Sequence, residues 1–415
     1  MAQKGIREYD AKRLLTGVLD GYDGQVVLVG PGESLQDKVD EAPWLADTPL
    51  VVKPDQLFGK RGKHGLIGVN MDLDQANAWI KERAGKPVTV GEISDRLEYF
   101  LVEPFIPHER ECYVALRTEL ESDVLYLSTS GGVDIEENWD TVREIRIPEG
   151  SVLDTRQLEG VVKEIFPAQN TRVIVDSLWR LYDLFVSGHF TYLEINPMTV
   201  IDGKFFPLDT VAKVDDTAAF ECRHLWGSLE FPAPFGHTPS EEEAFIEGID
   251  AKTGASLKLT VLKPDARIWT MVAGGGASVI FADTISDLGH GHELANYGEY
   301  SGNPSTEATY YYARTIIDLM TRAPDPEGRS KLLFIGGGIA NFTDVAKTFT
   351  GIIKAVEELA DRMKETDVRV YVRRGGPNYK LGLDRMKDLG ERLEIPIHVY
   401  GPETHMTNIV SMALA

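Results

Sequence analysis

The stretch FIGGGIANFTDVA, residues 334–346, predicts a strand that ends in a glycine turn shortly before a helix. Apolar residues come first, three glycines follow at 336–338, and Asn341, Thr343 and Asp344 are residue types found where helices begin. Glycines let a backbone approach a ligand closely, and the first turn of a helix carries free N–H groups and a partial positive charge. The stretch therefore predicts an anion site, but it does not name the anion.

The same succession of strand, turn and helix recurs on both sides of this stretch. The strand-like runs are RIWTMVAGG, KLLFIGGG, VRVYVRRGG and IPIHVYG. The helical patterns lie near residues 277–288, 305–322, 342–364 and 379–393. This alternation predicts βαβ crossovers and a mainly parallel, doubly wound α/β sheet. Ligands bind at the carboxyl ends of the strands in such sheets, so we expect one edge to be lined by the glycine turns at 274–276, 336–338 and 375–376.

A seam rich in proline and acidic residues, LEFPAPFGHTPSEEEA, interrupts the periodic pattern. We therefore expect one domain over residues 1–240 and a second over residues 241–415. Before the seam, β-rich runs such as LVVKPDQL and FTYLEINP are mixed with helical stretches such as VIVDSLWRLYDLFVSG, which predicts α/β or α+β packing. The N-terminal segment MAQKGIREYDAKRLL is charged throughout and is expected to be a helix.

The composition excludes several classes of protein. With 43 basic and 65 acidic residues the net charge is −22, which opposes nonspecific attraction to nucleic acid or to an anionic membrane. Only Cys112 and Cys222 are present, so a disulfide framework and a four-cysteine zinc site are excluded, and a reducing compartment fits. The longest apolar stretch, IWTMVAGGGASVIFA, is too short to span a membrane, and the N-terminus has no apolar signal core. We expect a cytoplasmic protein.

The stretch FTYLEINPMTVIDGKFFPLDT predicts a hairpin that carries oxygen ligands for a metal ion. Tyr192, Glu194 and Asn196 alternate with apolar residues and share one face. A turn at residues 202–203 would bring Asp209 beside Asn196, where both suit Mg²⁺ that stays partly hydrated and bridges nucleotide phosphates. The alternative is that the Asn-Pro pair starts a turn and that Asp209 is a solvated carboxylate.

Basic residues gather in the stretch LVVKPDQLFGKRGKHG. Lys53 follows an apolar run, which would aim its ammonium at a phosphate rather than into bulk water. Lys60, Arg61 and Lys63 follow among glycines and suit a flexible flap over a triphosphate, although the pattern G-x-x-x-x-G-K-[ST] is absent. The alternative is a basic surface loop on an acidic protein.

The run FLVEPFIPH is apolar up to Glu103 and is then broken by two prolines, as expected of a strand that crosses between subdomains. Its backbone would pair with the edge of an adenine while Phe105 and Ile106 pack on the ring. The alternative is an edge strand that ends at a proline.

In this order the pieces resemble the ATP-grasp fold of the succinyl-CoA synthetase β-subunit, starting from IREYDAKRLL, and they are more closely similar to the N-terminal half of ATP-citrate lyases. The resemblance is carried by VVKPDQL, RGKHGLIGVN, EPFIPH, TYLEINP, DAKTGASLKLT, ELANYGEYSG, IANFT, VRRGGPNY and IHVYGPETHMT. These motifs cover essentially the whole chain, which stops at MALA where the single-chain enzyme would continue. The chain thus looks like the small, or β, subunit of a two-subunit ATP-citrate lyase.

The resemblance implies an ATP-grasp domain over residues 1–240, with a small subdomain over about 18–106, and a citrate-binding, CoA-ligase-type domain of flavodoxin or Rossmann type over 241–415. It implies phosphate contacts at Lys53, Arg61 and Gly62, an adenine hinge at Glu103, Pro104 and Ile106, and a ribose contact at Glu111. It implies Mg²⁺ ligands at Asn196 and Asp209. The implied citrate contacts are Ser301, Gly302, Asn341, Thr343 and Arg374, where an arginine can grip a carboxylate bidentately.

The implied reaction converts citrate, CoA and ATP to acetyl-CoA, oxaloacetate, ADP and phosphate through a phosphorylated histidine. None of the nine histidines lies in the G-H-A-G type of loop that carries this residue; His290, His292 and His405 lack the motif. We therefore expect no catalytic residue on this chain. A larger partner subunit would carry the histidine, the main CoA site and the cleavage domain.

Three alternatives remain at this point. The nearest is the small subunit of a citryl-CoA synthetase. Succinyl-CoA synthetase is less close, because IANFT and VRRGG depart from its acid-binding positions. The third is a non-catalytic subunit that senses citrate or a nucleotide, which the presence of Lys53, Asn196 and Asp209 argues against.

Overall fold

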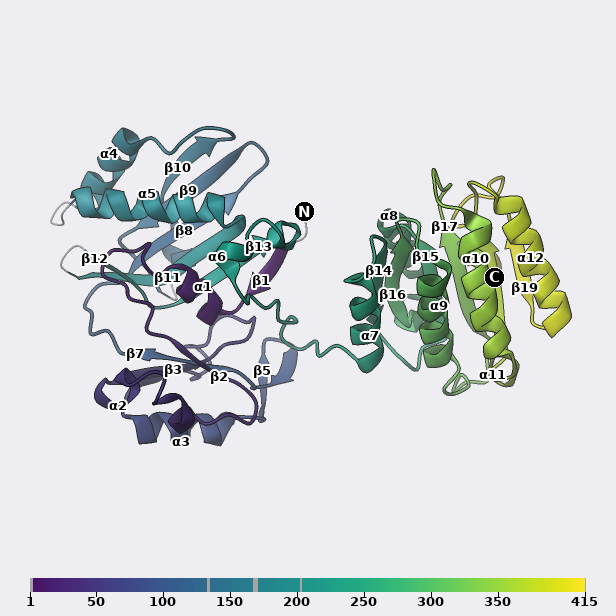
Figure 1. Cartoon of the computed structure of the whole chain (residues 1–415), viewed down its shortest axis with the longest axis horizontal. Helices are drawn as coiled ribbons and strands as arrows, with labels where there is room; N and C mark the ends of the chain where they lie inside the picture. The colour runs from purple at the N-terminus through teal and green to yellow at the C-terminus, as the bar shows by residue number, and fades with distance from the viewer. Residues whose placement is uncertain (1–2, 133–134, 167–170, 202–203, 415) are drawn as a thin grey trace. The chain divides into compact units, whose positions relative to one another are not determined.

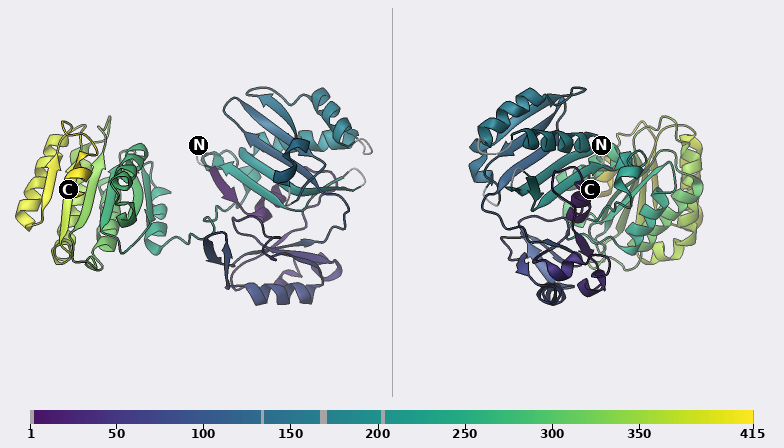
Figure 2. Two further views of the ribbon diagram at one scale, coloured as in Figure 1. Left: turned by 180° about the vertical axis from the view of Figure 1, so that it is seen from behind. Right: turned by 60° about the vertical axis from the view of Figure 1, so that its left-hand side comes forward.

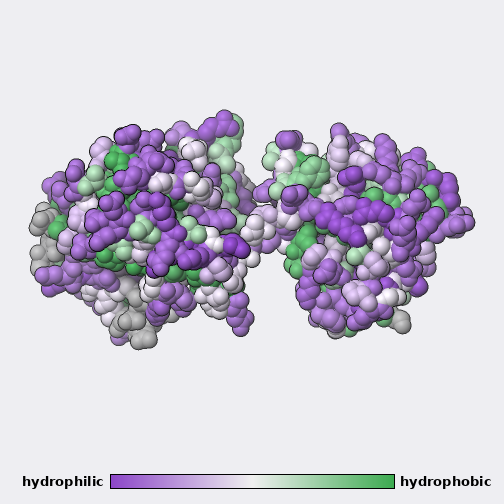
Figure 3. All heavy atoms as spheres, turned by 90° about the horizontal axis from the view of Figure 1, so that it is seen from below, coloured by the Kyte–Doolittle hydropathy of each residue, from purple (hydrophilic) through white to green (hydrophobic). Residues whose placement is uncertain are grey.

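The structure is a computed structural model that describes residues 3–132, 135–166, 171–201 and 204–414. The chain divides into two units, residues 1–238 and 239–415, each with its own hydrophobic core (Figure 1). The turn expected at residues 202–203 lies outside the described residues. The face shown in Figure 3 is largely hydrophilic, in keeping with the net charge of −22.

The described residues of the first unit form helices of 4 to 17 residues and three sheets. Its elements are β1 (Gln3–Ile6), α1 (Glu8–Leu14), β2 (Val27–Val29), α2 (Trp44–Asp47), β3 (Leu50–Pro54), β4 (Gly68–Met71), α3 (Leu73–Arg83), β5 (Pro87–Val90), β6 (Ile93–Arg96), β7 (Phe100–Pro104), β8 (Cys112–Thr118), β9 (Ser122–Ser128), β10 (Arg143–Pro148), α4 (Thr155–Ile165), α5 (Thr171–Ser187), β11 (Phe190–Ile201), β12 (Lys204–Pro207), β13 (Thr210–Asp215) and α6 (Arg223–Trp226).

The largest sheet of this unit is antiparallel, with strand order β1-β13-β11-β8-β9-β10 and with β12 paired to β11. Helices α4 and α5 cover one face of it (Figures 1 and 2), and Leu158 and Phe185 from these helices pack into its core. Along β11, Leu193 and Ile195 are buried while Tyr192 and Glu194 are only half-buried, which confirms the predicted alternation.

A smaller sheet has the order β2-β7-β3-β4 and packs against α3, whose Ala76 and Ile80 are buried in its core. Strand β7 contains Glu103 and lies between β2 and β3. The alternative that FLVEPFIPH forms an edge strand is therefore wrong. Strands β5 and β6 form a separate hairpin.

The elements of the second unit are α7 (Glu241–Asp250), β14 (Ser256–Val261), β15 (Ile268–Ala273), α8 (Gly275–Asp287), β16 (Asn296–Ser301), α9 (Thr306–Met320), β17 (Lys331–Gly337), α10 (Val345–Glu358), α11 (Ala360–Glu365), β18 (Val368–Arg373), α12 (Tyr379–Leu393), β19 (Ile397–Tyr400) and α13 (Asn408–Leu414).

The second unit is built on parallel strands in the order β15-β17-β18-β19. Strand β16 lies beside β15, because Leu294 forms a parallel bridge with Ile268 and the buried Asn296 amide bonds to both backbone groups of Thr270. The resulting order, β16-β15-β17-β18-β19, is that of flavodoxin-like folds. The chain places β16 on one side of β15 and then places β17, β18 and β19 on the other side, so the strand order reverses between β15 and β17. This confirms the predicted doubly wound, mainly parallel sheet.

Helices cover both faces of this sheet. Ile316 of α9, Phe349 of α10 and Met386 of α12 pack in one core, whereas Phe281 of α8 and Ile409 of α13 pack in another. Strand β14 pairs with β16 in antiparallel fashion and so adds one more strand at that edge of the sheet.

One prediction of local structure was wrong in part, and another lacked detail. The N-terminal helix begins only at Glu8, since residues 3–6 pair with β13 as an antiparallel strand. The helix expected over residues 342–364 begins at Val345 and is divided at Leu359 into α10 and α11. Strand pairing with a distant segment and a break within a helical pattern are both tertiary effects that local periodicity does not record.

Candidate functional site

A cavity of about 370 Å³ lies within the first unit. Strands β3 and β7, the segment before β2 and the β12–β13 connection all contribute to its walls. Of the residues predicted for nucleotide and metal, this cavity is lined by Lys53, Glu103, Pro104, Ile106, Glu111 and Asp209. Tyr22, Gln25, His108 and Phe206 also line it and were missed. Tyr22 and Gln25 lie outside the quoted motifs, whereas His108 and Phe206 lie within FLVEPFIPH and FTYLEINPMTVIDGKFFPLDT but were given no role.

The ammonium of Lys53 is buried and already has three acceptors. It donates to Glu8 Oε1 at 2.7 Å, to the carbonyl oxygen of Leu208 at 2.6 Å, and it lies 2.9 Å from Glu103 Oε1. A lysine ammonium has three N–H donors, so all of them are occupied. To contact a phosphate, Lys53 must therefore give up one of these three acceptors and take a phosphate oxygen in its place.

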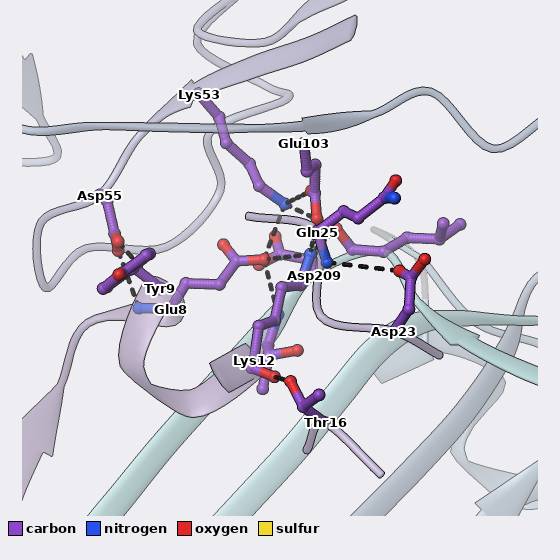
Figure 4. A network of polar contacts seen from close by, with 12 residues as sticks. Glu8, Tyr9, Lys12, Thr16, Asp23, Gln25, Lys53, Asp55, Glu103 and Asp209 are labelled. Atoms are coloured by element: carbon purple, nitrogen blue, oxygen red, sulfur yellow. Dashed lines mark hydrogen bonds and ion pairs between the residues drawn. The ribbon is translucent and has the colours of Figure 1, made fainter. Parts of the chain in front are cut away.

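Glu8 is the centre of a buried network that the sequence reading missed (Figure 4). Its Oε1 also lies 2.8 Å from Lys12 Nζ, and its Oε2 accepts from the Arg61 guanidinium at 2.6 Å. Burial alone would raise the pKa of Glu8, but Lys12, Lys53 and Arg61 together hold that pKa well below its usual value. The signal that could have revealed it is the Glu8–Lys12 spacing of four residues on a helix that also carries core residues.

Asp55 fixes the start of α1 and hence the position of Glu8. Its two carboxylate oxygens accept the backbone N–H groups of Glu8 at 2.8 Å and Tyr9 at 2.9 Å. These are first-turn groups that have no partner within the helix. Burial, and secondarily the charge of Glu8, raise the pKa of Asp55 to about 6.

Arg61 is turned inward rather than extended on a basic loop. It is 5% exposed and donates to the carbonyl oxygen of Pro54 at 2.9 Å, to Glu8 and to the carboxylate of Asp209. Lys60 and Lys63 on the same loop are exposed, and Gly62 lies between Arg61 and Lys63. The loop thus contributes one buried cation to the network and two cations to the surface.

Asn196 and Asp209 lie side by side, as the hairpin argument predicts. The Asn196 N–H donates to the carbonyl oxygen of Asp209 at 2.9 Å, and Met198 of β11 pairs with Pro207 of β12. Asn196 Oδ1 accepts the N–H of Gly132 at 2.6 Å. Burial raises the pKa of Asp209 and Arg61 acts against that rise. The two side chains offer oxygen donors of the kind that Mg²⁺ takes from proteins.

The predicted carboxylate-binding residues of the second unit are brought to one edge of its sheet. Ser301 is the last residue of β16 and Gly302 follows it. Asn341 and Thr343 lie in the loop after β17, and Arg374 directly follows β18. Because these strands are parallel, their carboxyl ends share an edge, and β15 and β17 flank the point where the strand order reverses.

Arg374 is a buried cation without an acidic partner. It is 6% exposed, donates from Nη1 to the carbonyl oxygen of Gly338 at 2.8 Å, and forms no ion pair with any residue that the structure describes. Burial lowers its pKa. The nearby hydroxyl of Tyr300 is also buried and has no hydrogen-bond partner among the described residues. A buried guanidinium in this state calls for an anion.

Glycine is required where Arg374 passes β17. Gly337 has φ 147°, and a Cβ there would lie 2.7 Å from Arg374 Nη1 and 3.0 Å from the carbonyl oxygen of Ala273. The neighbouring arginine has a different role, since Arg373 donates to the carbonyl oxygens of Gly337, Pro402 and Thr404.

The α10 N-terminus is less open to an anion than the sequence predicts. Asp344 accepts the Lys347 N–H at 3.0 Å, and the Val345 N–H donates to the carbonyl oxygen of Pro377. Helix α8 has no side-chain cap, and it begins at Gly275 directly after β15. Helix α12 begins at Tyr379 on the same edge and also has no side-chain cap, so α8 and α12 both begin here without one.

The histidines noted in the sequence have local partners. His290 Nδ1 lies 3.1 Å from Glu293 Oε2, and Glu293 is also bound by Arg267 and Arg329. His405 Nδ1 lies 3.1 Å from the Thr407 hydroxyl. Within the described ranges, no group of three His, Cys, Asp or Glu residues is arranged to hold a metal ion. No helix of the same residues is long and apolar enough to cross a membrane.

Comparison with known families matches both units. Residues 2–226 match the family described as ATP-citrate synthase ATP-grasp domain, and residues 237–415 match the family described as ATP citrate lyase citrate-binding.

Relatives match over the full chain. An ATP-citrate synthase alpha chain from Arabidopsis thaliana is 48% identical over 100% of this chain and 98% of its own length. The ATP-citrate synthase of Mus musculus is 46% identical over 100% of this chain, which covers 38% of that longer protein. A solved structure of ATP citrate lyase from Methanothrix soehngenii, in complex with citrate and coenzyme A, superposes with a TM-score of 0.91 at 51% identity and full coverage of both chains.

Proposed function

This chain belongs to the ATP-citrate synthase, or ATP citrate lyase, family, and from that membership we propose that its first unit binds MgATP and its second unit binds citrate. The chain is a subunit of the enzyme that converts citrate, CoA and ATP to acetyl-CoA, oxaloacetate, ADP and phosphate. The relatives compared above are named ATP-citrate synthase, which favours this activity over the citryl-CoA synthetase alternative.

In the first unit, Lys53, Arg61 and Gly62 would contact the phosphates of ATP. Glu103, Pro104 and Ile106 would form the adenine hinge, and Glu111 would contact the ribose. The support for this proposal is that most of these residues line one cavity. One backbone donor of this segment is not free to pair with adenine, because the N–H of Phe105, directly after β7, donates to the carbonyl oxygen of Pro49 at 2.7 Å.

Mg²⁺ would be held by Asn196 and Asp209. The site fits the ion, because two oxygen donors are held adjacent by a backbone hydrogen bond and Mg²⁺ usually takes one or two protein oxygens beside phosphates and water. The bound ion would neutralise part of the phosphate charge. Arg61 holds Oδ1 of the Asp209 carboxylate, so the ion would compete with Arg61 for this group, and a released Arg61 would be free to approach the phosphates.

In the second unit, Ser301, Gly302, Asn341, Thr343 and Arg374 would bind citrate. The observation that carries this part is Arg374, a buried guanidinium without a carboxylate partner among the described residues, at the carboxyl edge of a parallel sheet. A tricarboxylate supplies the missing anion and can be gripped bidentately.

We expect the catalytic histidine, the main CoA site and the citryl-CoA cleavage domain to lie on a larger partner subunit. The single-chain relative from Mus musculus is much longer than this chain, which agrees with a second part of the enzyme elsewhere. We place the complex in the cytoplasm, since Cys112 and Cys222 are both free thiols.

Calorimetric titration of the full chain with citrate and with succinate tests the citrate site. We expect selective binding of citrate that is lost in Arg374→Ala and kept in Arg369→Ala, which removes an exposed arginine from β18. Citrate binding that survives in Arg374→Ala would contradict the assignment. If the wild-type chain alone binds no citrate, the same titrations on the complex with the large subunit decide whether the partner completes the site.

A further inference from the structure

Lys12 is a buried ammonium beside the proposed nucleotide site, and no motif or comparison gives it a role. It is 0% exposed and does not line the cavity, whereas Lys53 does. A charged lysine is rarely buried in this way unless it is paired. We therefore infer the role of Lys12 from the groups that it contacts.

Lys12 and Lys53 contact the same two carboxylates and the same carbonyl oxygen (Figure 4). Lys12 Nζ lies 2.8 Å from Glu8 Oε1, 2.5 Å from Glu103 Oε2 and 3.1 Å from the carbonyl oxygen of Leu208. Lys53 Nζ lies 2.7 Å from Glu8 Oε1, 2.9 Å from Glu103 Oε1 and 2.6 Å from that same carbonyl oxygen. Two ammonium groups, one at the cavity and one behind it, thus neutralise the same two carboxylates.

This duplication matters when Lys53 turns toward a phosphate. Without Lys12, the departure of Lys53 would leave Glu103 with no cation and Glu8 with Arg61 alone, and an unpaired buried carboxylate is strongly unfavourable. With Lys12 in place, both carboxylates keep a cation at hydrogen-bond distance after Lys53 has moved.

We propose that Lys12 is a positioning residue for nucleotide binding: it keeps Glu8 and Glu103 neutralised, so that Lys53 can exchange these carboxylates for a phosphate oxygen. This inference rests on the proposed binding of ATP in the first unit. No proton is transferred in the exchange; Lys53 stays charged and replaces one anionic acceptor by another.

Calorimetry with MgATP on the full-length chain tests the proposal through four variants. In Lys12→Met, Lys53 is the only ammonium between the two carboxylates, and we expect ATP affinity to fall roughly tenfold or more, the size of about one charge-assisted hydrogen bond. In Lys12→Met/Glu103→Gln one carboxylate charge is removed as well, while the backbone of residue 103, the part proposed to pair with adenine, is kept. We expect most of the affinity to return. Lys12→Arg keeps the charge and should retain affinity, and Lys81→Met, on the exposed face of α3, is the matched control.

A purely structural role for Lys12 makes a different prediction. The second substitution would then restore no ATP affinity, even though thermal unfolding shows a folded protein. Unchanged ATP affinity in folded Lys12→Met would also overturn the proposal.

If Lys12→Met does not fold, Glu103→Gln alone still decides. It removes a carboxylate charge that holds Lys53 but keeps the backbone of residue 103, which is the part proposed to pair with adenine. ATP should therefore bind at least as tightly as to the wild type, and weaker binding would contradict the exchange. Failure of the wild-type chain to bind MgATP, alone and in the complex, would instead refute the proposed function of the first unit.

Discussion

The guanidinium of Arg61 donates to the carboxylate of Asp209, which is the carboxylate proposed to bind Mg²⁺. The same guanidinium is held on its other side by Glu8. A protein cation is therefore paired with the carboxylate that a metal cation would use, and we propose that metal and arginine compete for this anion.

This competition predicts opposite effects of one substitution on two ligands. Arg61→Met should bind Mn²⁺ in the absence of nucleotide several-fold more tightly than the wild type, because Asp209 loses its internal cation. The same variant should bind MgATP more weakly, because a phosphate contact is lost.

Manganese titrations followed by electron paramagnetic resonance, with calorimetry for MgATP, measure both effects. Lys63→Met, on the exposed part of the same loop, is the control and should change neither. Equal Mn²⁺ affinity in Arg61→Met and the wild type would show that Arg61 does not shield Asp209 from metal.

Asp55 predicts a pH dependence of stability. Its folded-state pKa of about 6 lies above its ordinary value of 3.8, so between these values the folded state binds more protons than the unfolded state. The contribution of Asp55 to stability is therefore fully present below pH 3.8, declines above it, and is lost as pH rises through about 6. From the size of this shift, the loss approaches about 3 kcal/mol.

Urea unfolding of wild type and Asp55→Asn across this pH range isolates the effect, because other carboxyl groups titrate in both proteins. The difference in unfolding free energy, mutant minus wild type, should rise with pH and level off above about pH 6. Asp74→Asn, an exposed position on α3, should show no such trend. A flat difference for Asp55→Asn would mean that this carboxyl titrates normally.

The sequence predicts the second unit better than the first, for a physical reason. Repeated strand and helix patterns specify a parallel sheet almost by themselves, and the sheet then places Ser301 and Arg374 at one edge. In the first unit, the partners Glu8 and Asp55 lie 47 residues apart, and only the packing of α1 against the segment after β3 brings them together. No local period marks such a contact.

The anion site predicted at residues 334–346 also shows what the sequence pattern cannot predict, here at the level of single side chains. The strand, the glycine turn and the following helix are all present. The acid at position 344, however, caps the helix itself, so the residue that signals a helix start also occupies its free N–H groups. Whether a helix end is open or capped depends on side-chain geometry that residue types alone do not specify.

Gly337 predicts a steric effect on the proposed citrate site. In Gly337→Ala the new Cβ would meet Arg374 Nη1 and the Ala273 carbonyl, at a φ that residues with side chains rarely adopt. We expect a stability loss of about 1–3 kcal/mol and a marked loss of citrate affinity. Gly338→Ala adds a methyl group in open space and is the control for stability. Normal citrate binding by Gly337→Ala would show that Arg374 tolerates displacement.

Substitutions of the adjacent Arg373 and Arg374 in VRRGG should affect different properties, protein stability in one case and citrate binding in the other. Arg373 is 5% exposed and its guanidinium donates to Gly337 O at 3.0 Å, Thr404 O at 2.9 Å and Pro402 O at 3.2 Å. It thereby joins the carboxyl end of β17 to the loop after β19. Arg374 makes one such bond and keeps donors available.

Arg373→Ala should therefore lower the free energy of unfolding by about 3 kcal/mol or more, since three carbonyl groups lose a charged donor. Arg374→Ala should change stability little, because it removes a buried cation without an ionic partner, yet it should abolish citrate binding. Urea unfolding and citrate calorimetry on both variants give the comparison. If both substitutions lowered the free energy of unfolding equally, these separate roles would be contradicted. The additional carbonyl contacts of Arg373 would then contribute nothing to stability.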